Sequence, residues 1–174
     1  MSENLFISII GSACRNGTHN KIRSNLYYNL CNKAIQKINE INNKNNKKII
    51  VVSGGAAFCD HIAITLYLYN YINELILYLP SSWNNNKYSD TKCGNISNYY
   101  HNLFSEKVGF NSLEQIQQSI NKGAHIYNYN NFYLRNKQIA LSSYIIAFGW
   151  DKNPTGGTLQ TLNLSTNNKI YITI

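Results

Sequence analysis

Acidic residues, proline and arginine are all scarce in this chain of 174 residues. Eight carboxylates stand against 16 lysines and arginines, which gives a formal net charge of +8, and there are only two prolines. A basic surplus favours acidic partners such as nucleotides, nucleic acids or anionic surfaces, although scattered lysines can also serve solubility alone. Because arginine occurs only at Arg15, Arg23 and Arg135, each of the three is informative about where an anion could bind.

The patterns of metal sites, disulfide frameworks and membrane spans are missing as well. The four cysteines form no CxxC pair, and the four histidines are spread along the chain. We therefore expect reduced thiols, no metal site and no cofactor. No apolar run approaches the length of a membrane span, and the polar start at 1–4 lacks the basic segment of a secretory signal. These features predict a cytoplasmic protein without membrane contact.

The apolar residues, 44% of the chain, recur in patterns that indicate an α/β fold. Continuous apolar runs predict strands at 5–10, 49–52, 75–79 and 144–148, with further strands at 125–129 and 170–174. Helical spacing predicts helices at 20–42, from 59 or 60 through 69, at 112–122 and from 158 to about 165. Buried strands that alternate with helices imply a three-layer α/β/α Rossmann-like sandwich with a mostly parallel sheet, formed by a single domain spanning 1–174.

A polar insert at about 80–122 interrupts this alternation. Its first part, 80–111, is rich in Asn, Ser and Tyr, and we expect a functional lid or a short helix at 99–104. Ser112 and Gln115 form a capping-box pattern, and Gly123 follows as a C-cap. Trp83, near the start of the insert, is a candidate to stack on a base, with core packing as the alternative.

Three loops that leave the carboxyl ends of predicted strands carry glycine together with polar residues: 11–16, 53–60 and 149–158. Parallel sheets bind ligands at this edge, near the switch in strand order. Gly-Gly-Thr at a helix start can present backbone N–H groups to an anion, and Arg135, in a polar loop before the strand at 144–148, can add a charged partner. The alternative is ordinary turn glycines and a capped helix. The candidate ligand-binding residues are Gly11, Ser12, Arg15, Ser53, Gly54, Gly55, Trp83, Arg135, Asn136, Gly156, Gly157 and Thr158.

Only two of the eight carboxylates, Asp60 and Asp151, lie in these loops. Asp60 can cap the following helix, accept a hydrogen bond from a ribose hydroxyl or activate a water. Asp151 precedes a turn, where an Asx-type turn role is the alternative to catalysis. A hydrolase that needs paired carboxylates would have to use these two residues.

The ordered set of motifs resembles the SLOG superfamily of Rossmann-like domains. The resemblance rests on Gly11-Ser12 with Arg15, on SGGAAFCD at 53–60, on LPSSW at 79–83, on Arg135-Asn136 before IALSSYIIAF, and on TGGTLQT at 155–161. It covers most of the chain outside the insert. It implies a nucleotide-like ligand over Gly54, Gly55, Gly156, Gly157 and Thr158, and self-association into a homo-oligomer.

Within that superfamily, the "Lonely guy" phosphoribohydrolases carry a glutamate in a PGGxGTxxE motif. Here Thr158 is followed by Leu159, Gln160 and Thr161, so no carboxylate stands there. The Smf-like DNA-processing proteins share the Arg135-Asn136 pattern, but this chain shows no additional DNA-binding domain.

These observations support three hypotheses. The first is a binding module that holds a nucleotide or nucleotide-derived small molecule by its phosphate, as a sensor or to sequester it. The second is a nucleotide N-glycosidase or phosphoribohydrolase that uses Asp60 or Asp151. The third is a protein that binds single-stranded nucleic acid through its basic surface.

Overall fold

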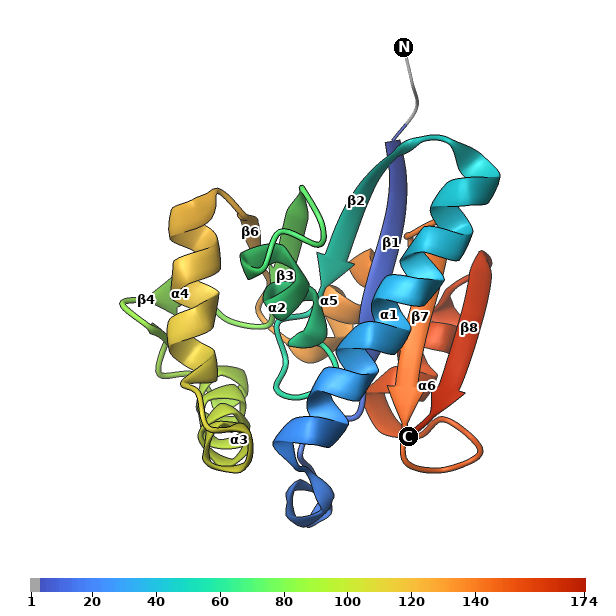
Figure 1. The fold of residues 1–174 in the computed structure, drawn as a ribbon. Coiled ribbons are helices and arrows are strands. Elements are labelled where there is room, and N and C mark those ends of the chain that lie inside the picture. The colour runs from blue at the N-terminus through green and yellow to red at the C-terminus, as the bar shows by residue number, and fades with distance from the viewer. Residues whose placement is uncertain (1–3) are drawn as a thin grey trace.

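Six parallel strands form the central sheet in the computed structural model, which describes residues 4–174 (Figure 1). Residues 1–3, which belong to the polar start considered above, lie outside the described residues. The strand order is β6-β3-β2-β1-β7-β8, and each neighbouring pair is parallel. The strands are β1 (Asn4–Gly11), β2 (Lys48–Ser53), β3 (Leu75–Leu79), β6 (His125–Asn128), β7 (Tyr144–Gly149) and β8 (Asn168–Thr173).

The strand order reverses between β1 and β7. The chain builds outward from β1 to β6 on one side of the sheet and then crosses to β7 on the other side. β1, β2 and β7 are buried over most of their length, as their continuous apolar sequences predict for a sheet covered on both faces. The α/β fold with a parallel sheet is therefore confirmed.

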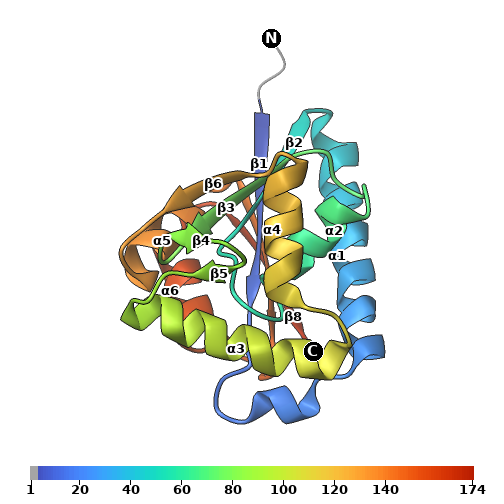
Figure 2. The same cartoon turned by 90° about the vertical axis from the view of Figure 1, so that its left-hand side faces the viewer.

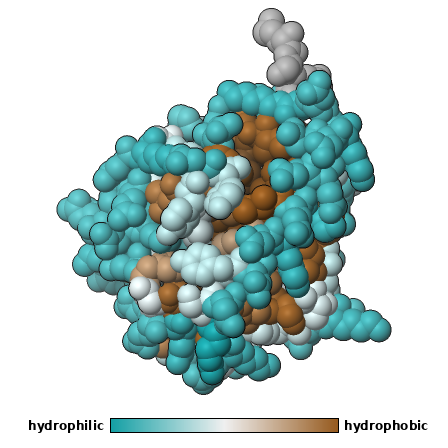
Figure 3. Space-filling model, in the orientation of Figure 1, coloured by the Kyte–Doolittle hydropathy of each residue, from teal (hydrophilic) through white to brown (hydrophobic). Residues whose placement is uncertain are grey.

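Helices cover both faces of the sheet and complete three layers. The larger core cluster packs residues of α1, α2, α3 and α4 against one face, and a smaller cluster lies beneath α5 and α6 on the other (Figures 1 and 2). The outer surface of the α1 side is mostly hydrophilic, with hydrophobic residues visible between the helices (Figure 3). The helices are α1 (Ser24–Asn45), α2 (Ile62–Leu68), α3 (Lys92–Val108), α4 (Ser112–Lys122), α5 (Phe132–Ile139) and α6 (Gly156–Leu164), with a 3-10 turn η1 (Thr18–Lys21) before α1.

The polar insert contains more regular structure than the sequence predicts. A small hairpin, β4 (Trp83–Asn84) and β5 (Lys87–Tyr88), leads into α3, a 17-residue helix where a short one at 99–104 is expected. The buried positions of α3 have helical spacing but include small and polar residues, so apolar periodicity does not reveal them. They are Gly94, Ser97, His101, Phe104 and Val108.

The cap residue of α4 and the placement of Arg135 and Asn136 differ from their sequence predictions, although α4 spans the predicted residues. α4 has Asn111 as its N-cap, because the Asn111 side chain accepts a hydrogen bond from the Glu114 amide, so the expectation of Ser112 as the cap is wrong. Gly123 ends α4 in the left-handed conformation, as predicted. α5 begins at Phe132, so Arg135 and Asn136 lie in a helix and not in a polar loop. Arg135 and Asn136 are buried although they are polar. The buried face of α5 therefore lacks the apolar spacing by which an amphipathic helix is recognised in a sequence.

Within residues 4–174, no helix combines the length and apolar composition that crossing a membrane requires. The four cysteines are free thiols, three of them buried.

Candidate functional site

A cleft of about 620 Å³ opens at the carboxyl edge of the sheet, at the β1–β7 switch point. The loops after β1 and β7, the start of α6 and the side chains of α5 enclose it, so two of the three predicted loops meet there. The third loop, 53–60, contributes only Ala56 and Asp60. Ten of the predicted site residues line the cleft: Gly11, Ser12, Arg15, Asp60, Arg135, Asn136, Asp151, Gly156, Gly157 and Thr158.

Four predicted residues lie outside the cleft. Ser53 is buried beneath it, where its hydroxyl donates to the Asp60 carbonyl at 2.8 Å and accepts from the Gly55 amide at 3.2 Å. Gly54 and Gly55 belong to the same supporting loop. Trp83 lies in the β4–β5 hairpin, where its indole N–H donates to Oε1 of Gln117 at 2.7 Å. The structure thus places these residues around the site and not in its wall.

The N-terminus of α6 faces the cleft with free backbone donors. The first-turn N–H groups of a helix have no partner within the helix, and Thr155, the N-cap, provides no side-chain hydrogen bond. Gly156 has φ +55°, a left-handed conformation that glycine adopts without strain. No acidic residue occupies this first turn. The helix start is therefore ready to accept an external anion.

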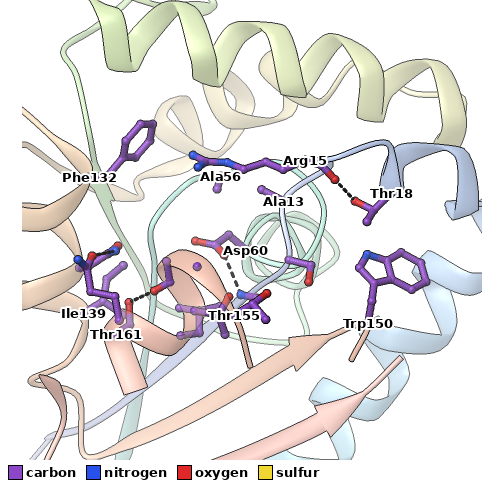
Figure 4. Close-up of a pocket in the computed structure, with 18 of the residues that line it drawn as sticks. Ala13, Arg15, Thr18, Ala56, Asp60, Phe132, Ile139, Trp150, Thr155 and Thr161 are labelled. Carbon is purple, nitrogen blue, oxygen red and sulfur yellow. Dashed lines mark hydrogen bonds between the residues drawn. The ribbon is translucent and has the colours of Figure 1, made fainter. Parts of the chain in front are cut away.

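Arg15 supplies an unengaged positive charge above this helix start. The guanidinium carbon lies 5.6 Å from the ring centroid of Tyr100 and 5.3 Å from that of Phe132, which hold it by cation–π contact. Within residues 4–174, its guanidinium has no hydrogen-bond acceptor or carboxylate partner. Figure 4 shows Arg15 extending over the cleft above Asp60, with Phe132 and Trp150 on opposite sides. Arg15 thus keeps its hydrogen-bond donors available to a ligand.

Arg135, in contrast, is 8% exposed and is engaged by the protein. Its Nη1 donates to the Gly54 carbonyl at 3.0 Å, while Nε and Nη2 donate to Oδ1 of Asn136 at 3.1 and 2.8 Å. Burial lowers the pKa of Arg135, and the negative charge of Asp60 opposes that shift. Arg135 therefore acts as the buried counter-charge of Asp60 and supports the loop beneath the cleft.

Asp60 is the buried carboxylate of the cleft. Its Oδ1 accepts a hydrogen bond from the Gly11 amide at 3.0 Å, which ties the end of β1 to the 53–60 loop. Burial raises the pKa of Asp60, and Arg135 and nearby backbone amides counteract the shift. The N-cap of α2 is His61, so Asp60 does not cap that helix. Asp151, the other candidate, is exposed at the cleft rim, and its carbonyl accepts from the Tyr171 hydroxyl at 2.7 Å.

Phe58 anchors the 53–60 loop in a strained conformation. Its φ is +67°, unusual for a bulky residue, and its side chain is fully buried. The ring stacks on Trp150, with centroids 5.6 Å apart and planes inclined by 16°. Such strain persists where packing over-determines it and is common at functional sites. This contact joins the 53–60 loop to Trp150, which lines the cleft.

A polar network from the insert, which the sequence does not predict, supports Gly55. The Gly55 carbonyl accepts from the Tyr88 hydroxyl at 2.5 Å and from Nε2 of His101 at 2.9 Å. Because a carbonyl only accepts, His101 carries its proton on Nε2, so Nδ1 accepts from the Ser112 hydroxyl at 2.9 Å. Burial lowers the pKa of His101 to about 4, which keeps the ring neutral. Only the folded chain brings these residues together, so no sequence motif reveals them.

Comparison with known proteins gives a relative but no activity. The chain is 42% identical over 132 residues to Uncharacterized protein R261 of Acanthamoeba polyphaga mimivirus, and the alignment covers 74% of this chain and 73% of that protein. No protein-family model matches the chain, and no solved structure matches it.

Proposed function

This chain belongs to the same family as the mimivirus protein R261, and we propose that it binds a nucleotide or nucleotide-derived ligand by its phosphate in the cleft at the β1–β7 switch point. The protein acts as a sensor of that ligand or sequesters it. The SLOG resemblance of the Gly-containing motifs points in the same direction.

One observation carries the proposal: the uncapped start of α6 and the unengaged guanidinium of Arg15 line one cleft. Free amides and the helix dipole favour an anion at a helix N-terminus. Guanidinium groups match phosphate oxygens by paired hydrogen bonds. Within residues 4–174, no carboxylate satisfies either group.

The remaining features of the cleft suit the rest of a nucleotide. Its volume of about 620 Å³ lies within the range of small-molecule sites. Asp60 provides an acceptor for a sugar hydroxyl, and Ile10, Ile139 and Trp150 provide apolar and aromatic wall. A ligand with a phosphate, a hydroxyl-bearing sugar and a planar base matches these three kinds of surface.

Thermal denaturation and calorimetry with the four common nucleoside monophosphates and their parent nucleosides test the proposal. A ligand that binds only the folded state raises Tm, and the rise grows as the ligand concentration exceeds Kd. We expect a monophosphate to stabilise the protein and its nucleoside to do so far less. Arg15→Gln should weaken binding by roughly 10- to 100-fold, as expected for losing a hydrogen bond to a charged group.

Arg23→Gln is the matched control for that substitution. Arg23 lies outside the cleft and donates to the carbonyls of Asn20 and Ile22. The Arg23→Gln variant should bind the monophosphate like the unmodified protein. Equal binding of nucleoside and nucleotide, or full binding by Arg15→Gln, would contradict the proposal.

A second candidate function is hydrolysis of the N-glycosidic bond of a nucleotide. The observation in its favour is Asp60, a buried carboxylate in the cleft whose pKa is raised. Release of free base from a monophosphate, measured by chromatography and abolished by Asp60→Asn, would establish it. Binding without release of base would leave the binding module as the function.

A further inference from the structure

A chain of hydrogen bonds runs from the 53–60 loop through α5 to α6. Arg135 donates through Nη1 to the Gly54 carbonyl and through Nε and Nη2 to Oδ1 of Asn136. Asn136 then donates through Nδ2 to Oε1 of Gln160 at 2.9 Å. Arg135, Asn136 and Gln160 all line the cleft.

The donors and acceptors in this series of hydrogen bonds determine which way the side-chain amides of Asn136 and Gln160 point. A guanidinium only donates, so the Asn136 atom that faces Arg135 must be the carbonyl oxygen. The other Asn136 atom is then the NH₂ group, which needs an acceptor. The Gln160 atom that faces Asn136 must therefore be Oε1, and the Gln160 NH₂ is left pointing away from α5.

That NH₂ group is free and accessible. Within residues 4–174 it has no hydrogen-bond partner, and it is not among the buried polar atoms that lack one. Gln160 follows Gly156 by four residues, so its side chain lies over the helix start on the same face of α6. A Cβ on Gly157 would lie 3.6 Å from Nδ2 of Asn136, so the hydrogen bond between Asn136 and Gln160 lies beside the first turn of α6.

We infer that Gln160 is a specificity-determining residue whose NH₂ group donates to an oxyanion at the start of α6. This role rests on the proposed function: the group recognised is a phosphate, whose unprotonated oxygens accept hydrogen bonds from donors of Gln160, Arg15 and the α6 amides. Arg135 and Asn136 act as positioning residues, because they fix Gln160 with its donor outward. The acceptor of the cleft, Asp60, hydrogen-bonds to Gly11 and serves another part of the ligand.

Two substitutions separate ligand recognition from a merely structural role. Gln160→Glu has nearly the same shape and keeps an oxygen for Asn136 Nδ2, but it replaces the free donor with negative charge. Gln160→Met removes both the oxygen that accepts from Asn136 and the NH₂ donor, and it adds no charge. We expect Gln160→Glu to weaken binding of AMP and inorganic phosphate on the order of 100-fold or more, and Gln160→Met by about 10-fold.

Calorimetry with AMP and with inorganic phosphate measures these affinities, and thermal denaturation without ligand verifies that each variant is folded. If Gln160 only supports Asn136, Gln160→Glu keeps that support and is weakened only by the repulsion of its added charge, which salt screens, so Gln160→Met is the weaker variant at high salt concentration. That order at high salt would overturn the inference and leave the proposed function standing. Absence of any binding to the unmodified protein would overturn both.

Nuclear magnetic resonance provides a test on the unmodified protein that does not depend on whether a variant folds. The side-chain NH₂ signals of Gln160 in the unmodified protein should shift as phosphate is added, because the ligand accepts from this group. The side-chain NH₂ signals of Gln118, an exposed residue of α4, are the internal control and should not move. Unchanged Gln160 signals at saturating phosphate would contradict the inference.

Discussion

The Asp60 carboxylate and the Arg135 guanidinium meet at the backbone of Gly54. A Cβ built on Gly54 would lie 2.7 Å from Oδ2 of Asp60 and 2.9 Å from Cζ and Nη1 of Arg135. The two charged groups are 3% and 8% exposed, so each depends on the other to offset the loss of water. The glycine is therefore required sterically for these two opposite charges to lie close together at the cleft.

Gly54→Ala should destabilise the protein by about 1–3 kcal/mol, because the added methyl group displaces one or both charged side chains. Urea denaturation measures the change. Gly157→Ala is the matched control, since its Cβ would make an ordinary contact of 3.6 Å with Asn136, and it should change stability by less than about 0.5 kcal/mol. Equal stability of the two variants would contradict the steric role of Gly54.

Arg135→Met should cost about 3–5 kcal/mol of stability, because it leaves the buried charge of Asp60 without its positive counter-charge. Adding Asp60→Asn should recover much of that loss. The pKa of Asp60 is already raised by burial, and removing Arg135 raises it further. A group with a raised pKa stabilises the fold at low pH and loses that contribution as pH rises, so the difference between Arg135→Met and the unmodified protein should grow with pH. A difference independent of pH would argue against the pairing.

The sequence predicts the sheet well because the sheet follows one simple rule. Its central strands are buried on both faces, so continuous apolar runs mark them, and β3 has the predicted bounds. Apolar periodicity does not predict the helices α3 and α5 in the same way. His101, Arg135 and Asn136 occupy buried positions where helical periodicity expects apolar residues, and their polar partners lie far away in the sequence.

The candidate site shows the same division. Strand ends place the loops at 11–16 and 149–158 together, so the position of the cleft follows from the order of strands and glycines. The different roles of the two arginines cannot be predicted from the sequence, because they depend on tertiary contacts. Arg15 lies between aromatic rings, and Arg135 is held by Gly54 and Asn136. The role of Gln160 depends likewise on the orientation of a neighbouring amide.

Two buried histidines should make the protein sensitive to mild acid. Burial lowers the pKa of His61 to about 3 and that of His101 to about 4, whereas an unfolded histidine has a pKa of about 6.5. Between pH 6.5 and 4 the unfolded chain binds more protons, so the free energy of unfolding falls as pH falls, by up to about 1.4 kcal/mol per pH unit for each histidine. Asp60, with its raised pKa, opposes this trend in part.

Urea denaturation at pH 7, 6 and 5 measures that dependence, with variants to assign it. His101→Gln should reduce the slope by up to about 1.4 kcal/mol per pH unit, because one titrating group is gone. Ser112→Ala removes the hydroxyl that donates to His101 Nδ1 but keeps the histidine, so it should lower stability while the slope persists. An unchanged slope in His101→Gln would show that His101 does not carry the acid sensitivity.

The two tryptophans offer a direct report of where the ligand binds. Trp150 lines the cleft and stacks on Phe58, whereas Trp83 lies in the hairpin of the insert, outside the cleft. In Trp83→Phe, the fluorescence of Trp150 should change when AMP is added, with excitation chosen beyond the nucleotide absorption band. In Trp150→Phe, the remaining Trp83 should not respond. Trp83→Phe also loses the hydrogen bond to Gln117, worth about 1 kcal/mol, so its folding is verified first. A response from Trp83 and none from Trp150 would place the nucleotide at the insert and contradict binding at the β1–β7 switch point.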